Sequence, residues 1–238
     1  MKMNKKLTII LLVLYLLNKT ALLCEKKDLN KSNFNKTQTT LIKGNFMNYQ
    51  VKQELYPKNL DGISEKQISE HWKLYEGYVA QTNKLQDELK NGDSSALTYS
   101  DRRRRLSFEL NGIILHELYF ENLKPNLSLS KNSELINALT SQFGSFEKWK
   151  EDFENCGKTR GIGWTILYYD TTTKNFFNTF IAEHEIGHIA SLKPILIMDV
   201  WEHAYMVDHG ATERGKYITA FMKNINWEVV EDRFSEAI

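Results

Sequence analysis

The most informative segment of the chain is Asp199-Val200-Trp201-Glu202-His203-Ala204-Tyr205. It follows a short apolar run at residues 195–198 and places a carboxylate four residues before an imidazole. On a helix or a tight turn, side chains at positions i and i+4 face one point, so a single segment can supply two ligands to a metal ion. A lone His is more often a hydrogen-bonded core residue, so a metal site needs further ligands elsewhere.

Two long helices are expected upstream of this stretch. Apolar and aromatic residues recur at three- and four-residue steps over residues 65–91, with Ser64 in the capping position, and a second helix fits residues 100–123 before Pro125. The connection between them is short, which predicts an antiparallel hairpin. Each helix carries one candidate ligand, His71 on the first and His116 on the second.

Shorter elements are expected after residue 126. Helices are predicted at residues 132–142 and 145–155, strands at 165–169, 176–182 and 195–198, and helix again from residue 204 onward, with late elements at 217–222 and 227–234. The predicted fold class is therefore α+β: an N-terminal antiparallel helical hairpin (residues 49–126) followed by a C-terminal α/β domain with a small antiparallel sheet (residues 127–238).

The N-terminus is typical of a secretory signal peptide. Lys2, Lys5 and Lys6 precede an apolar run at residues 7–17, which is too short to span a bilayer. We expect residues 1–24 to direct export to the periplasm or the medium and residues 25–48 to form a flexible lead-in. An uncleaved membrane anchor is the alternative, because no clean small-residue cleavage site is present. Contact with a membrane is expected only through that segment.

Composition narrows the class of protein. The net charge of the whole chain is +1, and loss of residues 1–24 removes four Lys and no acid, which leaves −3. A mature chain without excess positive charge is not expected to bind nucleic acid. Cys24 and Cys156 are the only cysteines, which excludes a disulfide framework and a cysteine-ligated zinc site. Three imidazoles and one carboxylate suit iron or manganese.

The seven residues at 199–205 match, residue for residue, the signature of the iron/manganese superoxide dismutase family. Residues 63–79, 111–119, 161–164 and 224–227 resemble other conserved regions of that family in the same order. The resemblance implies one iron or manganese ion per subunit, with superoxide as substrate. Superoxide would be disproportionated to dioxygen and hydrogen peroxide by one-electron cycling of the metal. The implied ligands are His71, His116, Asp199 and His203.

The resemblance also implies residues that tune the metal. Family members place a Gln or a His beside the metal-bound solvent. The helix position for this group is Gly112, so His184 from the strand region is the candidate, with a surface His as the alternative. The resemblance also implies a Tyr at the entrance of the substrate funnel. Tyr78 is the candidate for this gateway residue, and Tyr75 is the alternative. Gly112 removes the helix-borne Gln that many iron enzymes carry, and His184 resembles the arrangement of members that use either metal; of the two metals, we expect iron.

Other positions bear on the walls of the site and on assembly. Trp164 and Trp201 are expected to form an apolar wall or to be ordinary core. Glu202, which reaches the partner subunit in the family, is retained, so a homodimer or homotetramer is expected. Tyr75 and Met206 replace a His–Tyr pair that crosses the dimer in many members.

Two rival functions remain open on the sequence. A non-catalytic member of the same fold would act as a binding or structural module and predicts disrupted ligands. A non-haem iron oxygenase would use two His and one carboxylate and predicts a cosubstrate pocket. The basic run at residues 102–105 fits either anion steering or a solvated helix face. His188 and His209 are expected to be ordinary core or surface residues.

Overall fold

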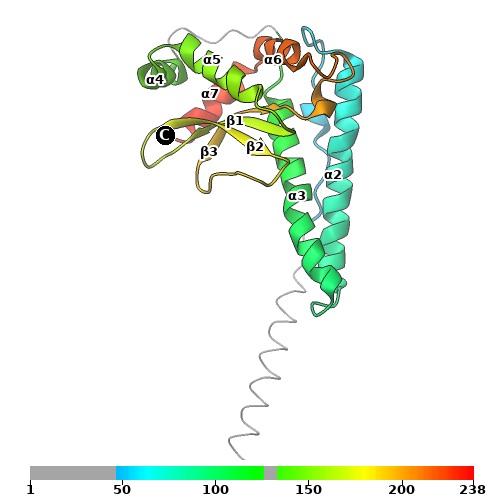
Figure 1. Cartoon of the computed structure of the whole chain (residues 1–238). Helices are drawn as coiled ribbons and strands as arrows, with labels where there is room; N and C mark the ends of the chain where they lie inside the picture. The colour runs from blue at the N-terminus through cyan, green and yellow to red at the C-terminus, as the bar shows by residue number, and fades with distance from the viewer. Residues whose placement is uncertain (1–46, 126–132) are drawn as a thin grey trace, which may run out of the picture.

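The computed structural model describes residues 47–125 and 133–238 (Figure 1). The predicted signal peptide and all but the end of the predicted lead-in lie outside the described residues. Within the described part of the chain, no helix has both the length and the apolar character needed to cross a bilayer.

Two long antiparallel helices form one side of the molecule, α2 (Glu65–Asn91) and α3 (Leu97–Glu121), after a single turn of 3-10 helix, η1 (Gln53–Leu55) (Figure 1). Ser64 caps α2 as predicted, because its hydroxyl accepts a hydrogen bond from the Gln67 amide at 3.0 Å. The second helix begins and ends earlier than predicted. It stops before Asn122, whose side-chain amide donates to the Ile197 carbonyl at 2.6 Å and so joins the helix end to the sheet.

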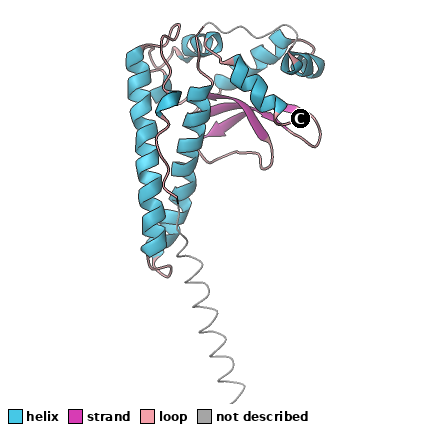
Figure 2. Ribbon diagram, turned by 180° about the vertical axis from the view of Figure 1, so that it is seen from behind, coloured by secondary structure: helices cyan, strands magenta, loops and turns pink. Residues whose placement is uncertain are grey.

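The sheet has three antiparallel strands in the order β2-β1-β3: β1 (Gly163–Tyr169), β2 (Phe176–Ala182) and β3 (Lys193–Asp199). Every residue of the central strand β1 is buried. Helix α3 contacts β3, and α5 (Phe146–Gly157) contacts β1 and β2. Helices α4 (Glu134–Phe143) and α7 (Trp227–Ser235) complete this half (Figure 2). The predicted α+β fold class is confirmed.

The segment after β3 is where the sequence prediction was wrong. Only residues 202–204 form a 3-10 turn, η2 (Glu202–Ala204), and turns and bends fill the chain up to α6 (Arg214–Lys223). Tertiary contacts explain the difference: the Asp208 carboxylate accepts hydrogen bonds from the amide and the hydroxyl of Ser64. This holds the turn against the start of α2. A regular helix from residue 204 is replaced by a connection that docks on the hairpin.

Candidate metal centre

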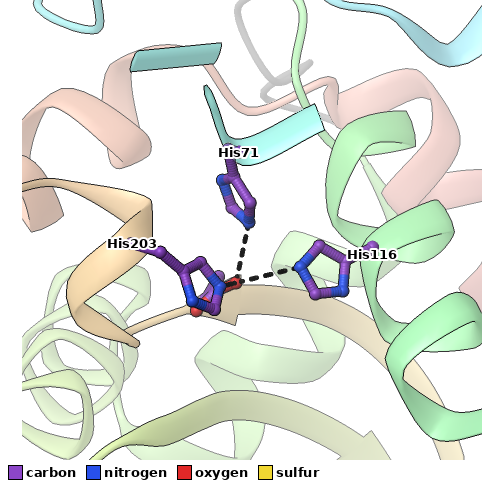
Figure 3. A group of neighbouring side chains, drawn as sticks. His71, His116 and His203 are labelled. Carbon is purple, nitrogen blue, oxygen red and sulfur yellow. Dashed lines mark hydrogen bonds and ion pairs between the residues drawn. The ribbon is translucent and has the colours of Figure 1, made fainter. Parts of the chain in front are cut away.

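Four side chains from four different elements meet where the hairpin packs against the end of β3. His71 comes from α2, His116 from α3, Asp199 from the last position of β3, and His203 from η2. One potential ligand atom of each lies within 4.8 Å of all the others, and Figure 3 shows the three imidazoles around the carboxylate. The structure thus brings together the four residues that the sequence nominated.

One oxygen of Asp199 lies at the centre of the group. Its Oδ2 atom lies 3.0 Å from Nε2 of His71, 3.1 Å from Nε2 of His203 and 3.8 Å from Nε2 of His116. The other oxygen, Oδ1, accepts a hydrogen bond from the Trp201 amide at 2.8 Å. That second bond fixes the rotation of the carboxylate, so Oδ2 faces the imidazoles.

His116 provides the clearest test of whether a metal fits. Its Nδ1 atom donates to the carbonyl oxygen of Gly112, one turn earlier on α3, at 2.6 Å. The neutral ring therefore has its lone pair on Nε2, which is buried and has no hydrogen-bond partner among the described residues. A buried acceptor aimed at a carboxylate and two further imidazoles has the chemistry of a metal ligand, and the hydrogen bond at Nδ1 is the usual orienting contact.

Burial sets the protonation state of the ligands. The side chains of His71, His116 and Asp199 are fully buried, whereas that of His203 is 20% exposed, so one edge of the group reaches solvent. Burial lowers the pKa of His71 and brings that of His116 well below its usual 6.5. For Asp199, burial opposes ionisation, but the contacts with His203 and His71 outweigh it and hold the pKa below the usual value. Neutral imidazoles and an ionised carboxylate are the forms that bind a metal.

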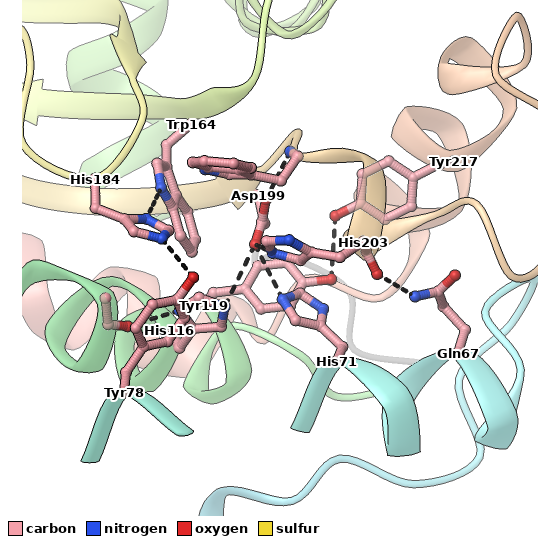
Figure 4. Close-up of polar contacts among 12 residues, drawn as sticks. Gln67, His71, Tyr78, His116, Tyr119, Trp164, His184, Asp199, His203 and Tyr217 are labelled. Carbon is pink, nitrogen blue, oxygen red and sulfur yellow. Dashed lines mark hydrogen bonds and ion pairs between the residues drawn. The ribbon is translucent and has the colours of Figure 1, made fainter. Parts of the chain in front are cut away.

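His184 lies beside this group in a hydrogen-bonded chain (Figure 4). The Trp164 indole N–H donates to Nδ1 of His184 at 3.0 Å, and Nε2 of His184 lies 2.8 Å from the Tyr78 hydroxyl. Because Nδ1 accepts, the neutral ring carries its proton on Nε2 and donates it to the Tyr78 oxygen. The hydroxyl hydrogen of Tyr78 is then free to point elsewhere. His184 is fully buried in the structure, unlike the surface His considered as an alternative.

The pKa values of this pair are shifted in opposite directions by the same cause. Burial lowers the pKa of His184 to about 4. Burial, assisted by the negative charges of Asp199 and Glu109, raises the pKa of Tyr78 above its usual 10. At neutral pH, His184 is uncharged and Tyr78 keeps its proton.

Gly112 explains why Tyr78 fits where it does. A Cβ atom at Gly112 would lie 2.6 Å from Cδ1 of the Tyr78 ring, closer than any real contact. The Tyr78 ring therefore occupies the space that a side chain at this position of α3 would need. A Gln at position 112 is incompatible with this placement of Tyr78.

The remaining predicted residues lie at different distances from the site. Trp201 stacks on both His184 and His203, with ring centroids 4.9 and 5.5 Å apart. Tyr75 lies one layer away, where its hydroxyl donates to Glu117 at 2.9 Å and accepts from the Lys52 amide at 3.0 Å. Glu202 and Met206 are exposed. Tyr78, not Tyr75, thus contacts the polar groups of the site.

Sequence reasoning missed two supporting contacts. Gln67 is buried one turn before His71. Its amide donates to the His203 carbonyl at 2.6 Å and accepts from the Val207 amide at 2.9 Å, which ties η2 to α2. Behind His71, the hydroxyls of Tyr119 and Tyr217 lie 3.1 Å apart. The i, i+4 spacing of Gln67 and His71 was a usable signal, but no local pattern connects Tyr119 to Tyr217.

The fold and the site together are those expected of a mononuclear metal protein in which three imidazoles and one carboxylate could hold the ion. Comparison with known proteins gives the family. Residues 131–233 match the family model described as iron/manganese superoxide dismutases, C-terminal domain. The iron superoxide dismutase of Aquifex aeolicus is 32% identical, and the alignment covers 79% of this chain and 92% of the relative.

Two further relatives carry different metals in their names. An iron superoxide dismutase of Cupriavidus metallidurans is 34% identical, with 76% of this chain and 93% of the relative covered. A manganese superoxide dismutase of Nocardia asteroides is 33% identical, with coverage of 72% and 85%. The chain belongs to the iron/manganese superoxide dismutase family.

Proposed function

We propose that the chain is a superoxide dismutase, which converts two superoxide anions and two protons into dioxygen and hydrogen peroxide. The observation that carries this proposal is the buried Nε2 atom of His116, directed with two other imidazoles at one carboxylate oxygen. The ligand set is intact, which a non-catalytic member of the fold would not require.

His71, His116, Asp199 and His203 would hold the metal. When bound, an iron or manganese ion supplies the one-electron acceptor and donor that the two half-reactions need. The protein residues keep this reaction away from bulk water, because His71, His116 and Asp199 are fully buried and Trp164 and Trp201 pack against the imidazoles.

Tyr78 and His184 would supply and orient protons. Reduction of superoxide to hydrogen peroxide consumes two protons, so a proton donor close to the metal is required. The raised pKa of Tyr78 keeps its hydroxyl protonated, and Nε2–H of His184 holds the Tyr78 oxygen at 2.8 Å. The Tyr78 hydrogen is then available to a bound anion.

The activity is tested on the purified chain reconstituted separately with iron and with manganese. Decay of a superoxide pulse is followed by absorbance. With at least one of the two metals, we expect the decay to become first order in superoxide, with a rate constant proportional to the enzyme concentration. Uncatalysed second-order decay with both metals, at full metal occupancy, would rule out the proposal.

For the metal, we propose iron. The support is that several relatives, among them those of Aquifex aeolicus and Cupriavidus metallidurans, are named as iron enzymes. The named relatives include both iron and manganese enzymes. Elemental analysis of protein isolated from its native source tests the proposal, since manganese in the majority of sites would contradict it.

For assembly, we propose a homodimer that covers the face around η2. Glu202 is exposed beside His203, and two apolar side chains in the following turn, Met206 and Val207, are 46% and 40% exposed. Light scattering after size-exclusion chromatography should give about twice the mass of one chain. Glu202→Ala should shift the protein toward monomer, and a monomeric wild-type protein would contradict the proposal.

For localisation, we propose export directed by residues 1–24. The support is the basic start and the apolar run at residues 7–17. N-terminal sequencing of the secreted or periplasmic fraction should find a chain that begins after the apolar run. Recovery of the intact N-terminus in the membrane fraction would indicate the tethered form instead.

A further inference from the structure

The loop that joins β2 to β3 presents His184 to the site. Glu183, immediately before His184, has a φ of 53°, in the left-handed region that residues other than glycine rarely adopt. Ala182 and Ile186 are joined by two backbone hydrogen bonds of 2.9 and 3.1 Å, which leave residues 183–185 as a tight tip. The position of the His184 backbone therefore depends on what holds this tip.

His188 holds the tip through its ring. Nε2 of His188 lies 2.8 Å from the carbonyl oxygen of His184, and Nδ1 lies 2.8 Å from the Tyr168 hydroxyl. A carbonyl only accepts, so Nε2 carries a proton and donates it to the His184 carbonyl, while Nδ1 pairs with the Tyr168 hydroxyl. Both ring nitrogens are used, one on the His184 backbone and one on β1.

The same strand also holds the ring of His184. Trp164, whose indole N–H donates to Nδ1 of His184, and Tyr168 are four residues apart on β1, a spacing that places both on one face of the strand. Tyr168 is 3% exposed, so its hydroxyl is a fixed anchor. Strand β1 thus contacts His184 twice: at the ring through Trp164, and at the backbone through Tyr168 and His188.

We propose that His188 is a positioning residue for dismutation, acting through the backbone of His184. The inference rests on the proposed function, because positioning matters only if His184 and Tyr78 take part in proton delivery. The 2.8 Å bond from His184 to Tyr78 requires both partners to be held in place, and hydrogen bonds weaken steeply as distance and angle depart from their optimum.

Two variants of similar size separate positioning from packing. His188→Leu fills the space without a donor, and His188→Gln keeps one donor and one acceptor. In iron- or manganese-loaded enzyme, His188→Leu should lower kcat about tenfold with metal content unchanged, and His188→Gln should stay within about twofold of wild type. Crystals of loaded His188→Leu should show the 2.8 Å contact between Nε2 of His184 and the Tyr78 hydroxyl lengthened beyond hydrogen-bonding distance.

His188→Leu in a His184→Ala background tests whether His188 acts through His184. His188→Leu should cost no further activity there, because no ring remains to be positioned. Wild-type activity in His188→Leu, equal losses in the Leu and Gln variants, or the same loss in the His184→Ala background would each overturn the proposal. If His188→Leu does not fold, Tyr168→Phe removes only the anchor and should lower kcat about threefold. An inactive wild type would refute the proposed function, and the crystal contact would then decide the positioning.

Discussion

The chemistry of the site depends on which nitrogen of each imidazole carries its proton. The Nδ1–H group of His116 donates a hydrogen bond to the Gly112 carbonyl, which leaves the lone pair on Nε2 available to bind a metal. His184 accepts at Nδ1 from Trp164, which directs its remaining proton at Tyr78. Two His on neighbouring elements are thereby assigned opposite tasks, one as an electron-pair donor and one as a hydrogen-bond donor.

Removal of the Tyr78 hydroxyl tests the proton supply. Tyr78→Phe should lower kcat by at least about tenfold while metal content stays at the wild-type level, because no ligand is touched. Tyr75→Phe is the matched control, since the Tyr75 hydroxyl contacts Glu117 and Lys52 and none of the ligands. Pulse radiolysis at high superoxide concentration measures kcat. Equal rates for the two variants would show that Tyr78 delivers no proton.

The buried neutral state of His184 makes stability depend on pH. Its pKa is about 4 in the folded protein against 6.5 for an ordinary His, so between these values the unfolded chain binds more protons than the folded one. Stability should therefore fall as pH falls from 6.5 to 4, by up to about 3 kcal/mol from this residue. His184→Gln does not titrate, so its free energy of unfolding in urea should fall less over that range. Parallel curves for the two proteins would contradict this assignment.

The candidate metal ligands could be predicted from the sequence, but the residues that hold them in position through hydrogen bonds could not. The family resemblance nominated His71, His116, Asp199 and His203, and the structure brings one potential ligand atom of each within 4.8 Å of the others. The contact between Tyr119 and Tyr217 joins residues 98 positions apart, and no periodicity encodes it. The link from His188 to Tyr168 was missed because each residue looks ordinary in its own segment.

At the element scale, helix α3 contains a glycine that a helix would normally avoid. Replacing an exposed helical Gly with Ala stabilises by about 0.5–1 kcal/mol, and Gly77 on α2, which has open space around its Cβ position, should behave in this way. Gly112→Ala should instead destabilise by about 1–2 kcal/mol, because the new methyl group would meet the Tyr78 ring at 2.6 Å. Urea unfolding of both variants measures the difference, and a stabilised Gly112→Ala protein would mean that Tyr78 can move aside at no cost.

Elements whose ends are fixed by their own residues were predicted correctly, and those held by distant residues were not. The first helix was predicted with its observed bounds because Ser64 and the apolar spacing define it from within. The region after Tyr205 was wrong because its turns are held by distant groups, Ser64 bonding Asp208 and Gln67 bonding Val207. Contacts between segments more than 130 residues apart cannot be predicted from the composition of either segment.

At the scale of the whole molecule, the hairpin and the sheet each supply part of one site. His71 and His116 come from the hairpin, and Asp199 and His203 come from the end of β3 and the turn after it, so neither half contains a complete ligand set. The order of elements was predictable from alternating patterns along the chain. How the two halves meet could be expected only through the family resemblance, because packing between them depends on contacts far apart in sequence.

The assignment of His71, His116, Asp199 and His203 as the metal site is tested by the metal content and superoxide dismutase activity of His116→Ala, both measured on one preparation. His209→Ala is the matched control, because His209 lies outside the four-residue group. We expect the His209 variant to keep one metal ion per chain with wild-type activity, and the His116 variant to lose most of both. Full metal content and full activity in His116→Ala would contradict the assignment of this site.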